Sequence, residues 1–157
     1  RNEFMTDTRG EGIMSAVFHG YEPYRGDIPH RSVGSLVCYE TGEATQYGLY
    51  GVQDRGNLFI TDQMPVYAGM ICGQSNRPGD IVVNVCKTKH VTNVRNSSAA
   101  EDSLRLVSVR PLTLEESLEF IDGDELLEVT PKSLRIRKRE LSHNQRMKAA
   151  SRKKQTE

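Results

Sequence analysis

The chain has 157 residues, of which 36% are hydrophobic and 6% aromatic, and its mean hydropathy of -0.57 is typical of a soluble protein with a modest core. It has no tryptophan, which excludes a tryptophan-lined stacking or sugar platform, and no apolar run approaches the ~18 residues that a membrane span needs. The net charge is zero, but the charges are separated, with nine acids and two bases in residues 101–128 and ten bases and two acids in residues 132–157.

The first part of the chain predicts a helix, a strand and then an extended connection. The helix would end at the Gly10/Gly12 pair, and residues 12–21, GIMSAVFHGY, have the β-branched and aromatic mix of a strand. Residues 21–31 contain two prolines, which favour an extended connection. We place a domain boundary near Arg25.

Residues 32–86 have a β pattern. Alternation in SVGSLVCYE predicts a first strand, and ATQYGLYGVQ, in which Tyr47, Leu49 and Gly51 sit two apart, predicts a second. NLFIT predicts a third strand after the DRGN turn, and IVVNVC predicts a further strand after SNRPGD. The segment between them, VYAGMICG, is short, apolar and interrupted by glycine.

The last third of the chain combines helices and a strand pair. SLRLVSV returns to alternation, and Thr113 followed by Glu116 has the spacing of a capping box, so a helix should begin there. ELLEVT and SLRIRKR predict two strands separated by Pro131, and their solvent faces would carry Glu125 and Glu128 on the first strand and Arg135 and Arg137 on the second. Ser142 would cap a final helix.

Three cysteines, Cys38, Cys72 and Cys86, bear on redox and metal chemistry. Their number is odd and no two form a CxxC pair, which argues for a reducing compartment, most simply the cytoplasm. Zinc usually needs four Cys or His ligands, and only Cys86 and His90 lie close together. Cys38 and Cys72 lie in apolar runs and are interpreted as small core residues. The sequence therefore indicates no metal site and no catalytic cysteine.

Motifs for nucleotide binding are also missing. GxxxxGK[ST] does not occur, and the glycines at 42, 48, 51 and 56 are spaced for strands and turns rather than as GxGxxG. We therefore expect no nucleotide cofactor and no enzymatic activity in this chain.

The stretch VCKTKHVTNVRNSSAA, residues 85–100, is the strongest candidate for a binding site. It contains no acid, and residues 87–102 are the longest stretch without periodicity. Cationic donors and neutral hydroxyl or amide donors together are the groups that bind phosphate and ribose oxygens. These residues are Lys87, Lys89, His90, Thr92, Asn93 and Arg95. The composition alone leaves two interpretations open, a nucleic-acid contact and a solvated surface loop.

Several long strings resemble one family, the BipA/TypA translational GTPases. They are TDTRGEGIM, VFHGYEPYRGDI, ETGEATQYGLYGVQDRGNLFI, VYAGMICG, DIVVNVCKTKHVTNVR and RPLTLEESLEFIDGDELLEVTPKSLRIRKREL. Together they cover essentially the whole chain, in the order found in that family.

The resemblance implies a fold and a domain division. Residues 1–24 would be the last helix and strand of a ferredoxin-like domain, which should be less well anchored without its partners. Residues 25–157 would be the family's C-terminal domain, a mainly β (α+β) fold with an OB-like β-barrel and one or two helices. The GTPase domain, with its GTP and Mg, would belong to a part of the longer protein that this chain does not contain.

The resemblance also implies a function. The family binds the bacterial ribosome and acts in stress adaptation and large-subunit assembly, and a loop of its C-terminal domain reaches A-site tRNA and large-subunit rRNA. That loop matches CKTKHVTNVR, which makes Lys87, Lys89, His90, Thr92, Asn93 and Arg95 the implied RNA contacts. Thr88 stands where the family usually has glycine, and it stiffens the backbone there.

Two further expectations follow for partners. A second, weaker RNA contact would come from the basic segment, with the residues Lys132, Arg135, Arg137, Lys138 and Arg139. We expect a monomer without a membrane partner. The alternative function is protein docking through the acidic segment 115–128.

Overall fold

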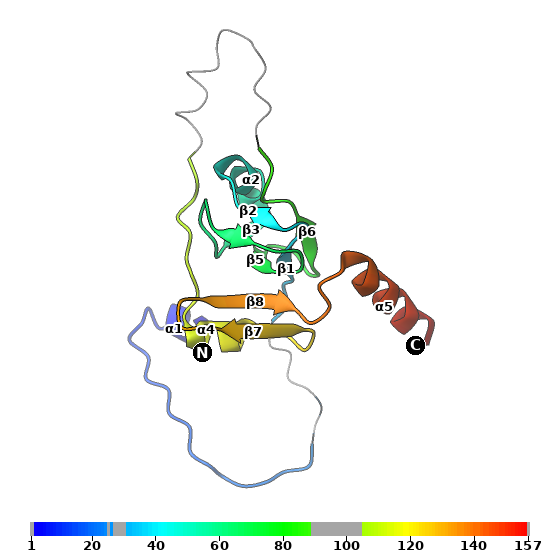
Figure 1. Ribbon diagram of the computed structural model, residues 1–157. Helices are drawn as coiled ribbons and strands as arrows, with labels where there is room; N and C mark the ends of the chain where they lie inside the picture. The colour runs from blue at the N-terminus through cyan, green and yellow to red at the C-terminus, as the bar shows by residue number, and fades with distance from the viewer. Residues whose placement is uncertain (1, 25, 27–30, 89–104, 157) are drawn as a thin grey trace, which may run out of the picture.

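The computed structural model describes residues 2–24, 26, 31–88 and 105–156 (Figure 1). Its helices are α1 (Asn2–Asp7), α2 (Gln46–Tyr50), the short 3-10 helix η1 (Gln53–Arg55), α4 (Leu114–Phe120) and α5 (His143–Thr156). Its strands are β1 (Ser35–Cys38), β2 (Gly42–Glu43), β3 (Gly56–Leu58), β4 (Pro65–Val66), β5 (Ile71–Ser75), β6 (Ile81–Val83), β7 (Glu125–Val129) and β8 (Leu134–Lys138). The fold is therefore α+β.

The central unit is a four-stranded sheet in the order β3-β5-β1-β6. β5 pairs antiparallel with β1 and with β3, whereas β6 runs parallel to β1. All four residues of β1 are buried. The strands predicted around residues 36, 58 and 82 are confirmed, and β1 lies in the interior of the sheet.

The core lies between this sheet, the small β2–β4 pair and α2. It contains buried aliphatic, sulfur-containing and small side chains from the strands and from α2, namely Leu36, Cys38, Ala44, Leu49, Val52, Leu58, Ile60, Val66, Met70, Cys72, Val83 and Val85. The interpretation of Cys38 and Cys72 as core residues is confirmed.

The second predicted strand, over residues 44–53, is wrong. Residues 46–50 form the helix α2, because Thr45 accepts a hydrogen bond from the backbone N–H of Gly48 and so caps a helical turn. Gly48 lies against the carbonyl of Val85, where a Cβ would clash. Leu49 is fully buried by this packing. Tertiary contacts thus override an alternating pattern.

The predicted hairpin is confirmed. β7 and β8 pair antiparallel with Leu127 opposite Ile136, around a turn in which the N–H of Thr130 donates to the carbonyl of Ser133 at 3.0 Å. The hairpin joins the central unit through a bridge between Met70 and Arg137 and through the N–H of Lys138, which donates to the carbonyl of Gly69.

Helix α4 begins with the predicted capping box. The Thr113 hydroxyl accepts from the N–H of Glu116, and the Glu116 carboxylate accepts from the N–H of Thr113. Ser117 is its buried residue, whereas Leu114 and Leu118 are 42% and 55% exposed. α5 begins directly after Ser142, as predicted, and projects away from the sheets (Figure 1).

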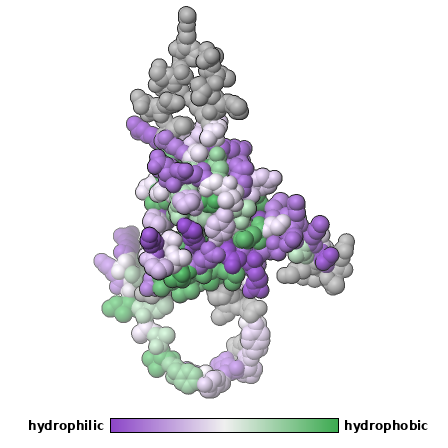
Figure 2. Space-filling model, in the orientation of Figure 1, coloured by the Kyte–Doolittle hydropathy of each residue, from purple (hydrophilic) through white to green (hydrophobic). Residues whose placement is uncertain are grey.

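The predicted strands at residues 12–21 and 103–109 are not formed in the described residues. After α1, residues 11–24 follow an extended path without backbone pairing to a strand (Figure 1). Their side chains Ile13, Val17, Phe18 and Tyr21 are 74–97% exposed, and Figure 2 shows green, hydrophobic atoms along part of this segment. A strand needs a neighbouring edge to satisfy its backbone, and the described residues offer none here.

The described residues form no closed barrel, since their strands fall into one four-stranded and two two-stranded sheets. The OB-like barrel is not confirmed. Among the helices described, none combines the length and apolar character required to cross a membrane.

Candidate nucleic-acid interface

Lys87 and Thr88 are the first residues of the predicted RNA-contacting loop. Upstream of them, Val85 is buried and Cys86 packs partly buried against the core. Lys87 and Thr88 are exposed. The chain therefore leaves the core at Cys86, and Lys87 is the first cation outside it. The other predicted contacts lie outside the described residues and stay predictions, namely Lys89, His90, Thr92, Asn93 and Arg95.

Thr45 holds this exit in place. Its N–H donates to the carbonyl of Val85 at 2.9 Å, and its hydroxyl donates to the carbonyl of Lys87. The same hydroxyl oxygen accepts the N–H of Gly48 at 3.0 Å. One side chain therefore ties the start of α2 to the root of the loop.

A hollow of about 530 Å³ lies beside Lys87. Three tyrosines contribute to its wall, and they are 58%, 43% and 41% exposed for Tyr39, Tyr47 and Tyr50. Arg55 and Lys87 supply cations to the lining. The remaining lining residues are Gly48, Gly51, Val52, Val82, Val83 and Asn84. Aromatic faces and cations thus meet at the root of the predicted loop.

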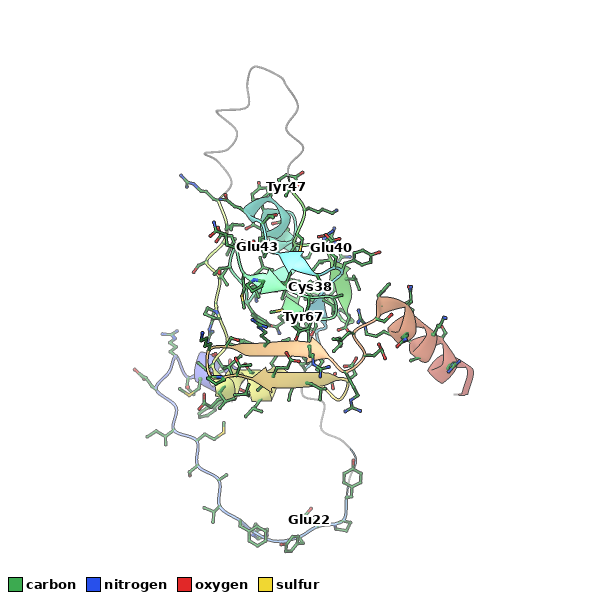
Figure 3. The ribbon with its side chains drawn as sticks, in the orientation of Figure 1. Glu22, Cys38, Glu40, Glu43, Tyr47 and Tyr67 are labelled. Atoms are coloured by element: carbon green, nitrogen blue, oxygen red, sulfur yellow. The ribbon has the colours of Figure 1, made fainter. Side chains whose placement is uncertain are left out.

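One acid, Glu40, is hydrogen-bonded to a lining residue of this hollow. Asn84 donates its side-chain amide to the carboxylate of Glu40 at 2.7 Å. Figure 3 shows Tyr47 at the same end of the domain as Glu40 and Glu43. Among the described residues, no carboxylate forms an ion pair with Arg55 or Lys87. Both cations are therefore free to meet an anion from outside that part of the chain.

The second predicted contact, the basic segment around β8, divides into exposed and engaged side chains. Lys132 is exposed in the hairpin turn, and Arg139 is exposed while its guanidinium donates to the carbonyl of Gly123 at 3.2 Å. Arg135 is half-buried. These three residues do not form one continuous surface with Lys138, which is buried.

Lys138 is engaged within the domain. Its ammonium lies 2.5 Å from Asp80, 3.0 Å from Asp124 and 3.0 Å from Glu125. Burial lowers the pKa of Lys138, but the hydrogen bonds to these carboxylates outweigh it and leave that pKa raised. Glu125, predicted on a solvent face, is instead buried, and its carboxylate also accepts from Arg31 and Ser35. That placement of Glu125 is wrong.

Arg137 is paired on the other face of the hairpin. Its Nε donates to Glu128 at 2.6 Å, and Tyr67 donates its hydroxyl to the same carboxylate at 2.7 Å. The Tyr67 hydrogen bond, followed by the Arg137 contact, holds the pKa of Glu128 below its usual value against the effect of burial. Burial and Glu128 raise the pKa of Tyr67. The guanidinium of Arg137 therefore already has an anionic partner.

The cysteine thiols lie in surroundings that disfavour reactivity. A hydrogen bond with Cys38, then burial, raises the pKa of Cys72, and burial followed by Glu40 raises the pKa of Cys86. Because the thiolate is the nucleophile and the metal ligand, the raised pKa values disfavour the reactive form of Cys72 and Cys86. Within the part of the chain that the structure describes, no three His, Cys, Asp or Glu side chains are grouped to hold a metal ion.

The tyrosine wall was not found by sequence reasoning. Tyr47 and Tyr50 are three residues apart, a spacing that places both on one face of a helix. The alternating pattern favoured a strand there, in which they would point to opposite faces. The signal that could have indicated the helix is Thr45, which lies three residues before Gly48, the spacing between an N-cap residue and the N–H that it accepts.

Comparison with known proteins gives the family. The TypA/BipA C-terminal domain matches residues 33–143. Similar relatives carry the name large ribosomal subunit assembly factor BipA. The Bacillus subtilis protein is 46% identical over 153 residues, 97% of this chain and 25% of the relative. The Synechocystis protein is 47% identical over 138 residues, which are 88% of this chain and 23% of that relative.

The protein of Escherichia coli K12 is 44% identical over 150 residues, which are 95% of this chain and 24% of that relative. The chain thus spans about a quarter of the length of these relatives. The matched domain includes the hollow, the root of the loop and the hairpin. The chain belongs to the TypA/BipA family, of which it carries the C-terminal domain.

Proposed function

We propose that this chain is the ribosome-binding, RNA-contacting module of a large-subunit assembly factor that acts in the cytoplasm as a monomer and in stress adaptation. The observation that carries the proposal is the match, over most of the chain, to relatives named large ribosomal subunit assembly factor. The exposed root of the loop at Lys87 is consistent with it.

Within this proposal, residues 87–95 face A-site tRNA and large-subunit rRNA. The segment has Lys87, Lys89, His90 and Arg95 and no acid. Ribosomal RNA is a dense polyanion, and each phosphate contact releases counterions, so binding should weaken steeply as salt rises. Such donors recognise the sugar-phosphate backbone and the shape of RNA rather than its base sequence. Lys132, Arg135 and Arg139 form a second contact region.

GTP binding, Mg and hydrolysis are assigned to the remainder of the longer protein. The family's C-terminal domain matches residues 33–143, and the chain spans about a quarter of its relatives. This module would therefore position the factor on the ribosome rather than perform chemistry.

The loop is tested by removing three of its cations. We expect that Lys87→Ala with Lys89→Ala and Arg95→Ala weakens co-sedimentation of the longer protein with ribosomes by about tenfold or more, because three phosphate contacts are lost. The matched control removes three cations elsewhere, with Arg9→Ala, Arg77→Ala and Lys148→Ala. Unchanged co-sedimentation of the loop variant at near-physiological salt, with the fold intact, would count against the proposal.

A second candidate function is protein docking through the acidic segment 115–128. The observation that favours it is helix α4, on which Leu114 and Leu118 are 42% and 55% exposed beside acidic residues. An apolar pair surrounded by carboxylates suits a basic protein partner. Ribosome association that survives RNase treatment and is lost with Leu114→Ser and Leu118→Ser would favour this function over the first.

A further inference from the structure

The hollow beside Lys87 gathers three partly exposed aromatic rings. Tyr39 follows β1, whereas Tyr47 and Tyr50 belong to α2, so the rings come from two elements. A volume of about 530 Å³ is within the range of sites that hold small ligand groups. Tyrosines lining such a space present apolar faces that a flat ring can cover.

The scaffold that carries these rings is rigid. Leu49 is fully buried between Gly48 and Tyr50, and Gly48 packs directly against the backbone of Val85. Thr45 caps the helix and binds the carbonyls of Val85 and Lys87. The backbone that carries Tyr47 and Tyr50 is therefore held in position before any ligand arrives, which reduces the entropy lost on binding.

The polar groups of the hollow favour an anionic ligand with a polar ring. Arg55 and Lys87 are exposed and have no ion-pair partner among the described residues. Asn84 supplies a side-chain amide, whose nitrogen already donates to the carboxylate of Glu40. Because Glu40 would repel a phosphate, the phosphate should lie toward Arg55 and Lys87.

We propose that this hollow binds one unpaired RNA nucleotide, with its base against the faces of Tyr47 and Tyr50 and its phosphate at Arg55 and Lys87. The inference rests on the proposed function, since it names the kind of RNA that the same surface takes. A base inside a duplex is covered by its neighbours, whereas an unpaired base can stack on an aromatic side chain. The site is therefore specific for single-stranded over double-stranded RNA.

The test measures the affinity of the whole chain for labelled RNA by fluorescence anisotropy. The probes are a short oligoadenylate, an oligouridylate and a duplex of the same length. We expect Tyr47→Leu with Tyr50→Leu to weaken single-strand binding by about tenfold, the size of effect that loss of one base–aromatic stack gives. Binding of the duplex should not change.

Two further variants guard against loss of the fold. Tyr47→Phe with Tyr50→Phe keeps the rings and should restore the binding that the leucine pair loses. Arg55→Gln, at an exposed position, should weaken single-strand binding and reduce its salt dependence. The control is Tyr21→Leu, since Tyr21 is 97% exposed and lies in the segment before residue 25.

The outcomes separate this inference from the proposed function. Single-strand binding that is unaffected by the leucine pair but falls with Lys87→Ala would overturn the tyrosine site and leave a backbone contact. Equal affinity of the chain for duplex and single-stranded RNA would also overturn the tyrosine site. Absence of oligonucleotide binding in a chain whose longer protein still co-sediments with ribosomes would also overturn the site, without affecting the proposed function.

Discussion

The ammonium of Lys138 lies among the carboxylates of Asp80, Asp124 and Glu125 at 2.5–3.0 Å, and its side chain is only 2% exposed. Removing this charge from water is costly, and three carboxylates offset the cost. Since the pKa of Lys138 is raised in the fold, its contribution to stability is fully present below the unfolded value of 10.5 and is lost as pH rises through the raised value.

Lys138→Met is expected to lower the free energy of unfolding by about 1.5–3 kcal/mol, because the buried carboxylate of Glu125 loses one of its two cationic partners and keeps only Arg31. Urea unfolding near neutral pH measures this loss. The matched control is Lys132→Met, an exposed position in the same hairpin, which should change stability by no more than about 0.5 kcal/mol. Equal effects of the two substitutions would contradict the role of Lys138.

The sequence holds a signal for this buried lysine that charge counting obscured. Leu134, Ile136 and Lys138 alternate along one face of β8, and Ile136 and Lys138 are buried. A run of bases suggested a solvated surface, whereas the period of two indicated the face turned inward. The partners come from two places in the chain: Asp124 and Glu125 are adjacent, with Glu125 opposite Lys138 in the hairpin, whereas no local pattern brings Asp80 to this lysine.

At the scale of elements, the local signals with a defined physical mechanism predicted the structure correctly. The capping box at Thr113 and Glu116 starts α4, and the two alternating segments around Pro131 form the β7–β8 hairpin. Both depend on contacts within a few residues. The helix α2 was predicted as a strand because its packing depends on Val85, far along the chain.

Gly48→Ala is expected to destabilise the domain by about 1–3 kcal/mol, since the added methyl group would clash with the backbone of Val85 and push α2 outward. Thermal unfolding measures the loss. Gly51→Ala is the matched control, because its nearest atom would lie at 3.6 Å, an ordinary contact.

Movement of α2 also displaces Tyr47 and Tyr50, so Gly48→Ala should weaken single-stranded RNA binding together with stability. If Gly48→Ala and Gly51→Ala unfold at the same temperature, the close approach of α2 to Val85 does not support the fold, and the rigid tyrosine wall loses its basis.

At the scale of the whole molecule, the two charge blocks of the sequence partly neutralise each other. Glu125 pairs with Lys138 and Glu128 pairs with Arg137 across the hairpin. The acidic and basic runs are therefore in part a structural pairing of adjacent strands. Lys87 and Arg55 have no such ion pair within the described residues, so both remain available for the RNA contact proposed above.

The arrangement of the sheets could not be predicted from local patterns. β1 pairs in parallel with β6, about 45 residues further along the chain, and the hairpin joins the central unit at Met70. Such pairings depend on the whole chain. The predicted barrel is not confirmed, and residues 11–24 have exposed apolar side chains in place of the predicted strand.

The central claim is that residues 87–95 meet ribosomal RNA. Crosslinking the longer protein to ribosomes and identifying the crosslinked residues tests it most directly. The account predicts crosslinks from residues 87–95 to large-subunit rRNA and A-site tRNA. Crosslinks confined to residues 115–128 and to ribosomal proteins would contradict it.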